Sequence, residues 1–108
     1  MRVYLDLSNV YDFQDFHAES FRAFKFTGFY DHDMESWTNA MINMIEDDDE
    51  LTGIYLTSDE HLTVLLEGTE MVINNCPEVL LGFMEAVALV NQRFADEGVN
   101  SRIRVIPS

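Results

Sequence analysis

The sequence predicts an α/β domain in which a small, three-stranded parallel sheet packs against about four helices. Segments of strand and helix character follow one another as strand, helix, helix, strand, helix, helix, strand, an order typical of crossover connections. The nearly continuous apolar run 62–66 is typical of a parallel strand buried on both faces. The chain has 108 residues, of which 47% are hydrophobic, and this is enough for one core and a single domain, residues 1–108.

The first strand and the first helix are predicted from local patterns. Apolar and polar residues alternate over 2–7, as expected for a strand with one buried face. Asp12 is a suitable N-cap for a helix over 13–24, and Asp15 follows it three residues later, as in a capping box. Four phenylalanines at helical spacing form one apolar stripe on this helix: Phe13, Phe16, Phe21 and Phe24.

A second helix is predicted after the break at Gly28. Either Asp31 or Asp33 can cap it, and an acidic first turn suits the helix dipole. The apolar positions expected to face the core are Met34, Trp37, Met41 and either Met44 or Ile45. The acidic run 46–50 should end this helix, because negative charge is unfavourable at the C-terminal end of the dipole.

The second half of the chain completes the alternation. Residues 53–56 are a candidate for an extra short strand, and Thr69 can cap a short helix that follows the run 62–66. Pro77 is suited to the first turn of a longer helix, which Gly98 should end. The apolar positions of that longer helix are Val79, Phe83, Val87, Val90 and Phe94. A last strand is predicted over 102–106.

The charge of the chain restricts its partners. Twenty Asp and Glu oppose six Lys and Arg, so the formal net charge is −14. Phosphate backbones and anionic membranes repel such a protein, so we expect it to bind neither. Residues 26–92 contain fourteen Asp and Glu and no Lys or Arg, which predicts a broad negative face with a basic partner. The run 46–50 is either a solvated loop or part of that partner-facing patch.

Few residues point to catalysis or to metal binding. The one cysteine, Cys76, cannot form an internal disulfide, which suits a reducing compartment, and a core or cap role is favoured over a reactive thiol. The three histidines lack metal-ligand spacing and are expected at the surface: His17, His32 and His61. The start of the chain lacks the apolar stretch of a signal peptide, and no run is long enough to span a bilayer. We therefore expect a cytoplasmic protein without enzymatic activity, cofactor or metal.

The stretch 26–45 resembles the barstar family of ribonuclease inhibitors. It reads FTGFYDHDMESWTNAMINMI, and the family's pattern there is roughly Pro-x-Tyr-Tyr-Gly-x-Asn-x-Asp-Ala-Trp/Leu followed by an aspartate-bearing turn. Residues 12–24 are similar to the family's first helix, and 76–78 with 88–93 are similar to the closing helix of a longer-chain branch. The resemblance covers most of the chain and implies a barstar-like fold, a three-stranded parallel sheet packed by helices.

The resemblance also implies a binding mode. In the family, the acidic second helix and the loop before it enter the nuclease active site in the place of substrate phosphates. By position, Phe29 corresponds to the family's loop aromatic residue, Glu35 to its first key aspartate and Asn39 to the aspartate that plugs the site. Glu97 corresponds to a further acid near the end of the last helix. Because the active site of a ribonuclease holds a polyanion with cationic side chains, a rigid acidic helix can mimic its substrate.

This sequence departs from the family pattern at four positions, which are Asp31, Asp33, Asn39 and Arg93. Arg93 stands where the family's namesake has an acid. Asn39 is a neutral amide, which can donate to or accept from a partner but cannot neutralise an arginine. Asp31 and Asp33 replace the glycine and the asparagine of the pattern and can supply part of the missing negative charge. The implied toxin-binding residues are Phe29, Tyr30, Asp31, Asp33, Glu35, Asn39 and Glu97.

Together these observations predict an immunity protein that binds and inhibits a basic nuclease toxin, with a ribonuclease as the favoured target. The toxin is either the cell's own secreted product or a domain delivered by a neighbouring bacterium in contact-dependent inhibition. We expect a monomer, or one half of a 1:1 heterodimer with the toxin. The alternative is an acidic adaptor or regulatory domain that binds another basic protein. A toxin-like reading frame with a basic C-terminal domain, immediately upstream, would separate the two hypotheses.

Overall fold

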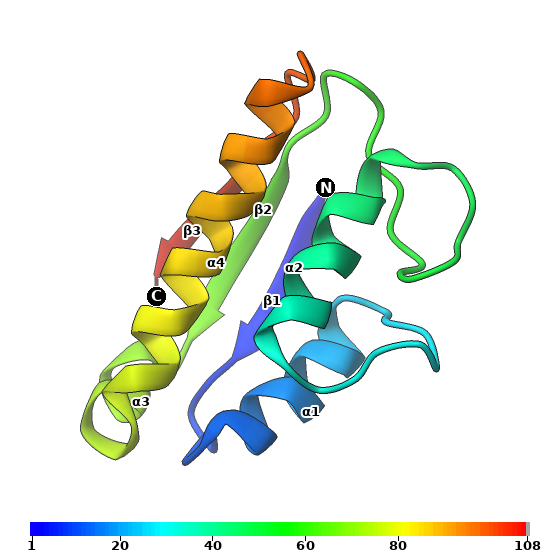
Figure 1. The fold of residues 1–108 in the computed structure, drawn as a ribbon. Coiled ribbons are helices and arrows are strands. Elements are labelled where there is room, and N and C mark those ends of the chain that lie inside the picture. Colours follow the sequence, from blue (N-terminus) through cyan, green and yellow to red (C-terminus); the bar gives the residue numbers. More distant parts are fainter. Residues whose placement is uncertain (108) are drawn as a thin grey trace.

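A computed structural model describes residues 1–107 and has the predicted α/β fold, a three-stranded parallel sheet packed against four helices (Figure 1). One short 3₁₀ helix, η1, directly follows α2. The elements are β1 (Arg2–Asp6), α1 (Phe13–Ala23), α2 (Met34–Ile42), η1 (Asn43–Ile45), β2 (Leu62–Glu67), α3 (Thr69–Asn75), α4 (Pro77–Asp96) and β3 (Ile103–Pro107).

The sheet has the order β1-β2-β3, with β2 in the centre and parallel to both neighbours. Val64 of β2 is in register with Val3 of β1 and Val105 of β3. Helices α1 and α2 lie in the connection from β1 to β2, and α3 and α4 lie in the connection from β2 to β3. Figure 1 shows α2 and α4 in front of the same side of the sheet. This side carries the core.

The central strand is less buried than its apolar sequence predicted. Leu62, Val64 and Leu66 point toward the helices and are buried, whereas Leu65 on the other side is only half-buried. The prediction of a strand buried on both faces was therefore wrong for one face. The uncovered side, which we call the open face, comprises Arg2, Tyr4, Asp6, Thr63, Leu65, Glu67, Arg104 and Ile106.

Helix α1 begins as predicted, but only two of the four phenylalanines of the predicted stripe, Phe16 and Phe24, are fully buried. The side chain of Asp12 accepts a hydrogen bond of 2.8 Å from the backbone nitrogen of Asp15, which confirms the N-cap. The helix buries Phe16, His17 and Ser20, whereas Phe13 and Phe21 are partly exposed. The predicted stripe of four phenylalanines is therefore too wide. With 3.6 residues in each turn, Phe13 and Phe21 both lie on the same side of Phe16, and Phe21 lies beyond His17 at the edge of the buried strip.

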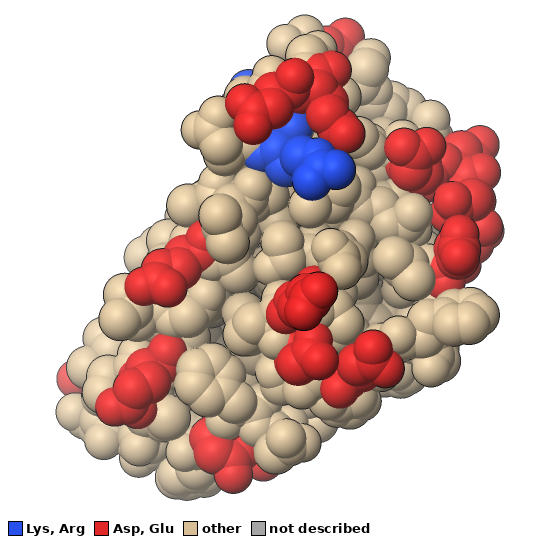
Figure 2. Space-filling view, viewed as in Figure 1, with Lys and Arg blue, Asp and Glu red and all other residues tan. Residues whose placement is uncertain are grey.

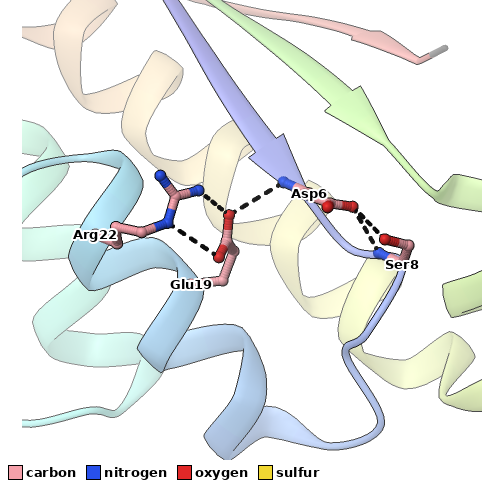
Figure 3. Close-up of polar contacts among 4 residues, drawn as sticks. All are labelled: Asp6, Ser8, Glu19 and Arg22. Atoms are coloured by element: carbon pink, nitrogen blue, oxygen red, sulfur yellow. Dashed lines mark hydrogen bonds and ion pairs between the residues drawn. The ribbon is translucent and has the colours of Figure 1, made fainter.

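Polar contacts join the end of β1 to α1 and to the turn that follows β1 (Figure 3). Glu19 of α1 accepts from the backbone nitrogen of Asp6 and from the guanidinium group of Arg22. The carboxylate of Asp6 accepts from the backbone nitrogen and the hydroxyl of Ser8, which lowers the pKa of Asp6. At Gly68, where φ is +73°, a Cβ atom would lie 2.4 Å from the backbone nitrogen of Ser8, so only glycine fits this junction.

The candidate strand over 53–56 does not form. Its backbone groups bond to loops and helices instead: Gly53 donates to the carbonyl of Lys25, and Leu56 donates to that of Met44. A single antiparallel bridge between Phe26 and Thr52 is the only strand-like pairing that the described chain has beside its sheet. Ile54 and Leu56 are nevertheless buried, so this apolar segment reflects core packing rather than strand formation.

Helix α4 follows its prediction closely. Pro77 is in the first turn, Gly98 has a φ of +74° just beyond the C-cap, and all five predicted core positions are buried. In the part of the chain that the structure describes, no single helix is both long enough and apolar enough to cross a membrane. Helices α3 and α4 pass that test only as a pair, and they are bent by 119° at Cys76.

Candidate partner-binding surface

The loop 26–33 is held to the core by the ring of Tyr30. This ring is 7% exposed and lies 4.5 Å, centroid to centroid, from that of Phe26, and the Tyr30 hydroxyl contacts Nδ1 of His17 on α1. Burial raises the pKa of Tyr30 above its usual value. Tyr30 therefore anchors the loop from inside, although its sequence position predicted contact with a partner.

His17 is buried, contrary to the prediction of a surface histidine. Its ring is 2% exposed, and burial, with a smaller contribution from nearby His32, lowers its pKa, while Asp33 opposes this shift. The sequence prediction placed His17 at the surface because a polar side chain on a helix usually faces solvent. The structure uses it as the polar partner that a buried tyrosine hydroxyl requires.

Phe29 lies at the exposed tip of this loop. Its side chain is 70% exposed, so the structure gives Phe29 no core role. A hollow of about 130 Å³ lies beside it, lined by Phe29, Tyr30, Asp31, Ser36, Asn39, Ala40 and Leu51. This volume is well below that of a typical small-molecule pocket, and it suits a single inserted side chain of a partner.

Asp33, rather than Asp31, caps α2. Its carboxylate accepts a hydrogen bond of 2.7 Å from the backbone nitrogen of Ser36, and this bond lowers the pKa of Asp33. The Ser36 side chain contacts the backbone of Asp33 in return and so completes a capping box. The first turn of α2 is therefore well fixed, and Asp31 remains as an exposed carboxylate beside it.

Glu35 and Asn39 project from the outer side of α2, one helical turn apart, and both are exposed. The opposite side of the helix is immobilised in the core. Trp37 and Met41 are fully buried, and the indole nitrogen of Trp37 donates to the hydroxyl of Ser20 over 3.2 Å. Glu35 therefore stands on a rigid support.

A groove runs between α2 and α4. Glu35 and Asn39 line one side of it, and Glu85 and Leu89 of α4 line the other. Further along, the groove is lined by Ile42, Gln92, Arg93 and Asp96 together with Thr38, Asn39 and Leu89. Sequence reasoning did not identify Glu85 or Leu89. The available signal was an exposed Leu89 (62%) one turn after Glu85, but only the packing of α4 beside α2 gives these residues significance.

Glu97 does not line this groove. It forms the C-cap of α4, and its carboxylate pairs with the guanidinium group of Arg93 at 3.4 Å. Arg93 is therefore a neutralised cation within an otherwise acidic surface. Of the seven predicted residues, four line the hollow, namely Phe29, Tyr30, Asp31 and Asn39, and two line the groove, namely Glu35 and Asn39. Asp33 and Glu97 line neither.

Acidic side chains lie in separate groups over the face that carries α2 and α4, with uncharged surface between them (Figure 2). Basic side chains gather on this face near the C-terminal end of α4, and a separate acidic group lies on the loop after α2. That loop contains the run 46–50, which has no regular secondary structure and whose residues are all exposed. Asp48 accepts from the backbone nitrogen of Glu50, and none of the five acids is in an ion pair among the residues described.

No set of three or more His, Cys, Asp or Glu within residues 1–107 could hold a metal ion. The thiol of Cys76 donates to the carboxylate of Glu78 over 3.1 Å, and this contact raises the pKa of Cys76. A thiol with a raised pKa is a poor nucleophile at neutral pH, which argues against the reactive role. Cys76 occupies the N-cap position of α4, but its side chain makes no capping hydrogen bond there.

No protein-family model matches the chain, and no curated protein is significantly similar to it. The functional argument therefore rests on the residues themselves and on their arrangement. The surface of α2, the loop before it and the facing side of α4 together form the candidate partner-binding surface.

Proposed function

We propose that this chain is a cytoplasmic immunity protein that binds a basic nuclease toxin, with a ribonuclease as the favoured target, and blocks its active site with α2 and the loop 26–33. The observation that carries the proposal is the rigid mounting of Glu35. This carboxylate is exposed and lines the groove, on a helix fixed by a capping box and by the buried ring of Trp37.

The mechanism follows from charge and rigidity. A nuclease binds its substrate with arginine, lysine and histidine side chains that are complementary to phosphate. Glu35 can take the place of a phosphate in such a site and pair with a cation, while Asn39 offers hydrogen bonds one turn further on. Because α2 is already ordered, the complex loses little side-chain and backbone entropy when these groups bind.

Phe29 and Leu89 supply the apolar part of the interface. Both are well exposed, and each lies at an acidic depression, Phe29 at the hollow and Leu89 in the groove. Exposed aromatic and aliphatic side chains at the edge of a concave acidic surface are suited to packing against a partner. The toxin would therefore meet one apolar contact at the hollow and one in the groove.

The test uses the C-terminal domain of the protein encoded immediately upstream of this chain. We expect that domain to degrade RNA, an equimolar amount of this chain to stop the reaction, and the chain alone to bind no RNA at ~150 mM salt. The on-rate should reach about 10⁸ M⁻¹s⁻¹ at low salt and fall steeply as salt increases.

The acidic-adaptor hypothesis makes the opposite prediction. If the upstream domain is not a nuclease, or if it remains active with a tenfold excess of this chain, the immunity function is wrong. A matched control is Glu70→Ala, since Glu70 is an exposed glutamate in the first turn of α3, just as Glu35 is in the first turn of α2. Inhibition should be weakened by Glu35→Ala and unchanged by Glu70→Ala.

A further inference from the structure

The open face of the sheet has no covering element within residues 1–107. Purely parallel sheets are nearly always covered on both faces, because their crossover helices pack on either side. Here the alternation of buried and exposed residues in β1 and β2 leaves one side bare. The middle of this side is apolar: Tyr4, Leu65 and Ile106 stand in register, with Tyr4 59% and Ile106 49% exposed.

On the open face, the basic and the acidic side chains lie at opposite ends of the strands. On one side of the apolar row, Arg2 and Arg104 flank Thr63 in register. On the other side, Asp6 is in register with Glu67. The ion pairs of the described chain include neither Arg2 nor Arg104. Two cations and two anions cancel, so the open face is locally neutral on a molecule of net charge −14.

We propose that the open face binds the open face of a second copy of this chain and forms a two-fold symmetric dimer. The axis would run across the strands along the apolar row, so that Tyr4, Leu65 and Ile106 meet their own counterparts. This rotation places the basic row of each copy over the acidic row of the other. Arg2 then faces Asp6 of the second copy, and Glu67 lies between Arg2 and Arg104.

Self-complementarity identifies a second copy as the occupant. A two-fold interface uses the same patch twice, so it requires a pattern that matches itself after rotation, and the basic, apolar and acidic rows provide one. Two stacked sheets lie about 10 Å apart, which long side chains such as arginine, tyrosine and glutamate can span. The helix face is not used, so each copy keeps its candidate toxin-binding surface free, and the proposal is independent of the toxin.

The test is sedimentation equilibrium of the full chain from about 1 μM to 1 mM at low salt. We expect a monomer–dimer equilibrium. Glu67→Arg and Arg104→Glu should each weaken it at least tenfold, because each brings like charges together across the interface. The double variant Arg104→Glu/Glu67→Arg restores the attraction between positions 67 and 104 with reversed signs, although Arg2 keeps its charge, and it should bind at least threefold more tightly than either single variant.

Charge-matched control variants on the helix face separate the effect of the contacts between the two open faces from the effect of the net charge. Arg93→Glu and Glu85→Arg change the net charge as Arg104→Glu and Glu67→Arg do, and they should alter the dissociation constant less than about twofold. A chain that stays monomeric at 1 mM, controls that act as strongly as the open-face variants, or a double variant that recovers nothing would each overturn the proposal. Glu35→Ala should leave the dimer unchanged, which separates this test from that of the toxin.

Discussion

Two acidic regions of this molecule differ in how their charges are held. Helix α2 and the loop 26–33 carry few acids, but these stand on a backbone fixed by a capping box and by the buried side chains of Tyr30 and Trp37. The loop 46–50 carries five acids in succession and no regular structure. The first region combines few charges with a fixed helix, and the second combines many charges with a loop that lacks regular secondary structure.

The comparison shows why charge density alone does not identify a binding site. An exposed carboxylate on a mobile segment is screened by salt and must lose conformational freedom when it binds, so each such contact contributes little. A carboxylate on a rigid helix can be desolvated against a cation without that loss. We therefore assign affinity to Glu35 and long-range attraction to 46–50, and the following predictions test this assignment.

The largest effect should come from the residue that makes α2 rigid. Trp37 packs against Phe16 of α1 and Phe83 of α4, with centroid distances of 6.2 and 5.7 Å. Trp37→Ala should lower the free energy of unfolding by about 3–5 kcal/mol, as measured by urea denaturation. Asp48→Asn in the acidic loop should change it by less than about 0.5 kcal/mol. If both variants lowered the free energy of unfolding by similar amounts, α2 would contribute no more to the fold than the loop 46–50 does.

Glu35→Ala should cost at least ~2 kcal/mol of toxin affinity by calorimetry, as expected for a preorganised charge buried in an interface. The loss should appear mainly in the dissociation rate, and the stability of the free chain should be unchanged. The matched Glu70→Ala variant should bind normally. If Asp48→Ala proves the more damaging substitution and Glu35→Ala is neutral, the acidic loop is the binding site instead of α2.

Phe29→Ala separates partner contact from core packing at the loop tip. Because the ring is 70% exposed, its removal should leave the melting temperature almost unchanged. We expect a loss of roughly 1 kcal/mol or more in toxin affinity, since an exposed aromatic ring at a depression gains area only on binding. Reduced stability together with unchanged affinity would assign Phe29 to the fold.

The anchoring of loop 26–33 should depend on pH through His17. Burial, with a contribution from His32, lowers the pKa of His17, whereas Asp33 raises it, so the unfolded chain takes up this proton at a higher pH than the folded chain does. The contribution of neutral His17 to the free energy of unfolding is therefore fully present above the ordinary histidine pKa of about 6.5, and it is lost as the pH falls below that value. Urea denaturation at pH 7.5 and 5.5 should show this loss in the wild type, and His17→Gln should reduce it. An equal loss in both proteins would exclude His17 as its origin.

The smallest effect is expected in the acidic loop. Asp48→Ala should cost less than ~1 kcal/mol of toxin affinity, and the change should appear mainly in the association rate. Stopped-flow measurement at low and high salt distinguishes the two contributions, because long-range attraction disappears at high salt. If Asp48→Ala still raises the dissociation rate at high salt, then Asp48 makes a direct contact in the complex, and the loop is as well ordered there as α2.

Features that depend on neighbours in the sequence were predictable, and features that depend on distant residues were not. The cap at Asp12 and the start of α4 at Pro77 follow from local hydrogen bonding and φ preferences, and both were confirmed. The burial of His17 depends on Tyr30, thirteen residues away, and the groove depends on α4 lying beside α2. No local pattern of charge or hydrophobicity carries that information.

The apolar run 62–66 shows the same limit. Its composition indicates a central strand, which the structure confirms, but composition does not say how many faces of the sheet the helices cover. The choice between Asp31 and Asp33 as the cap of α2 likewise required the position of Ser36. The toxin-binding residues that the resemblance implied remain predictions, and the structure places six of the seven on α2 or its preceding loop.

The pairing of β1 with β2 has a consequence for how the chain folds. The backbone nitrogen of Leu7 donates to the carbonyl of Glu67. The first strand therefore pairs only with β2, a segment about sixty residues later in the chain. Contacts this distant in sequence slow folding, because the entropy of closing a long loop is lost before the contacts that compensate for it can form. During synthesis, α1 and α2 therefore leave the ribosome well before the sheet that supports them exists. The groove beside α2 should therefore form only after α4 has been synthesised, because Trp37 of α2 packs against Phe83 of α4.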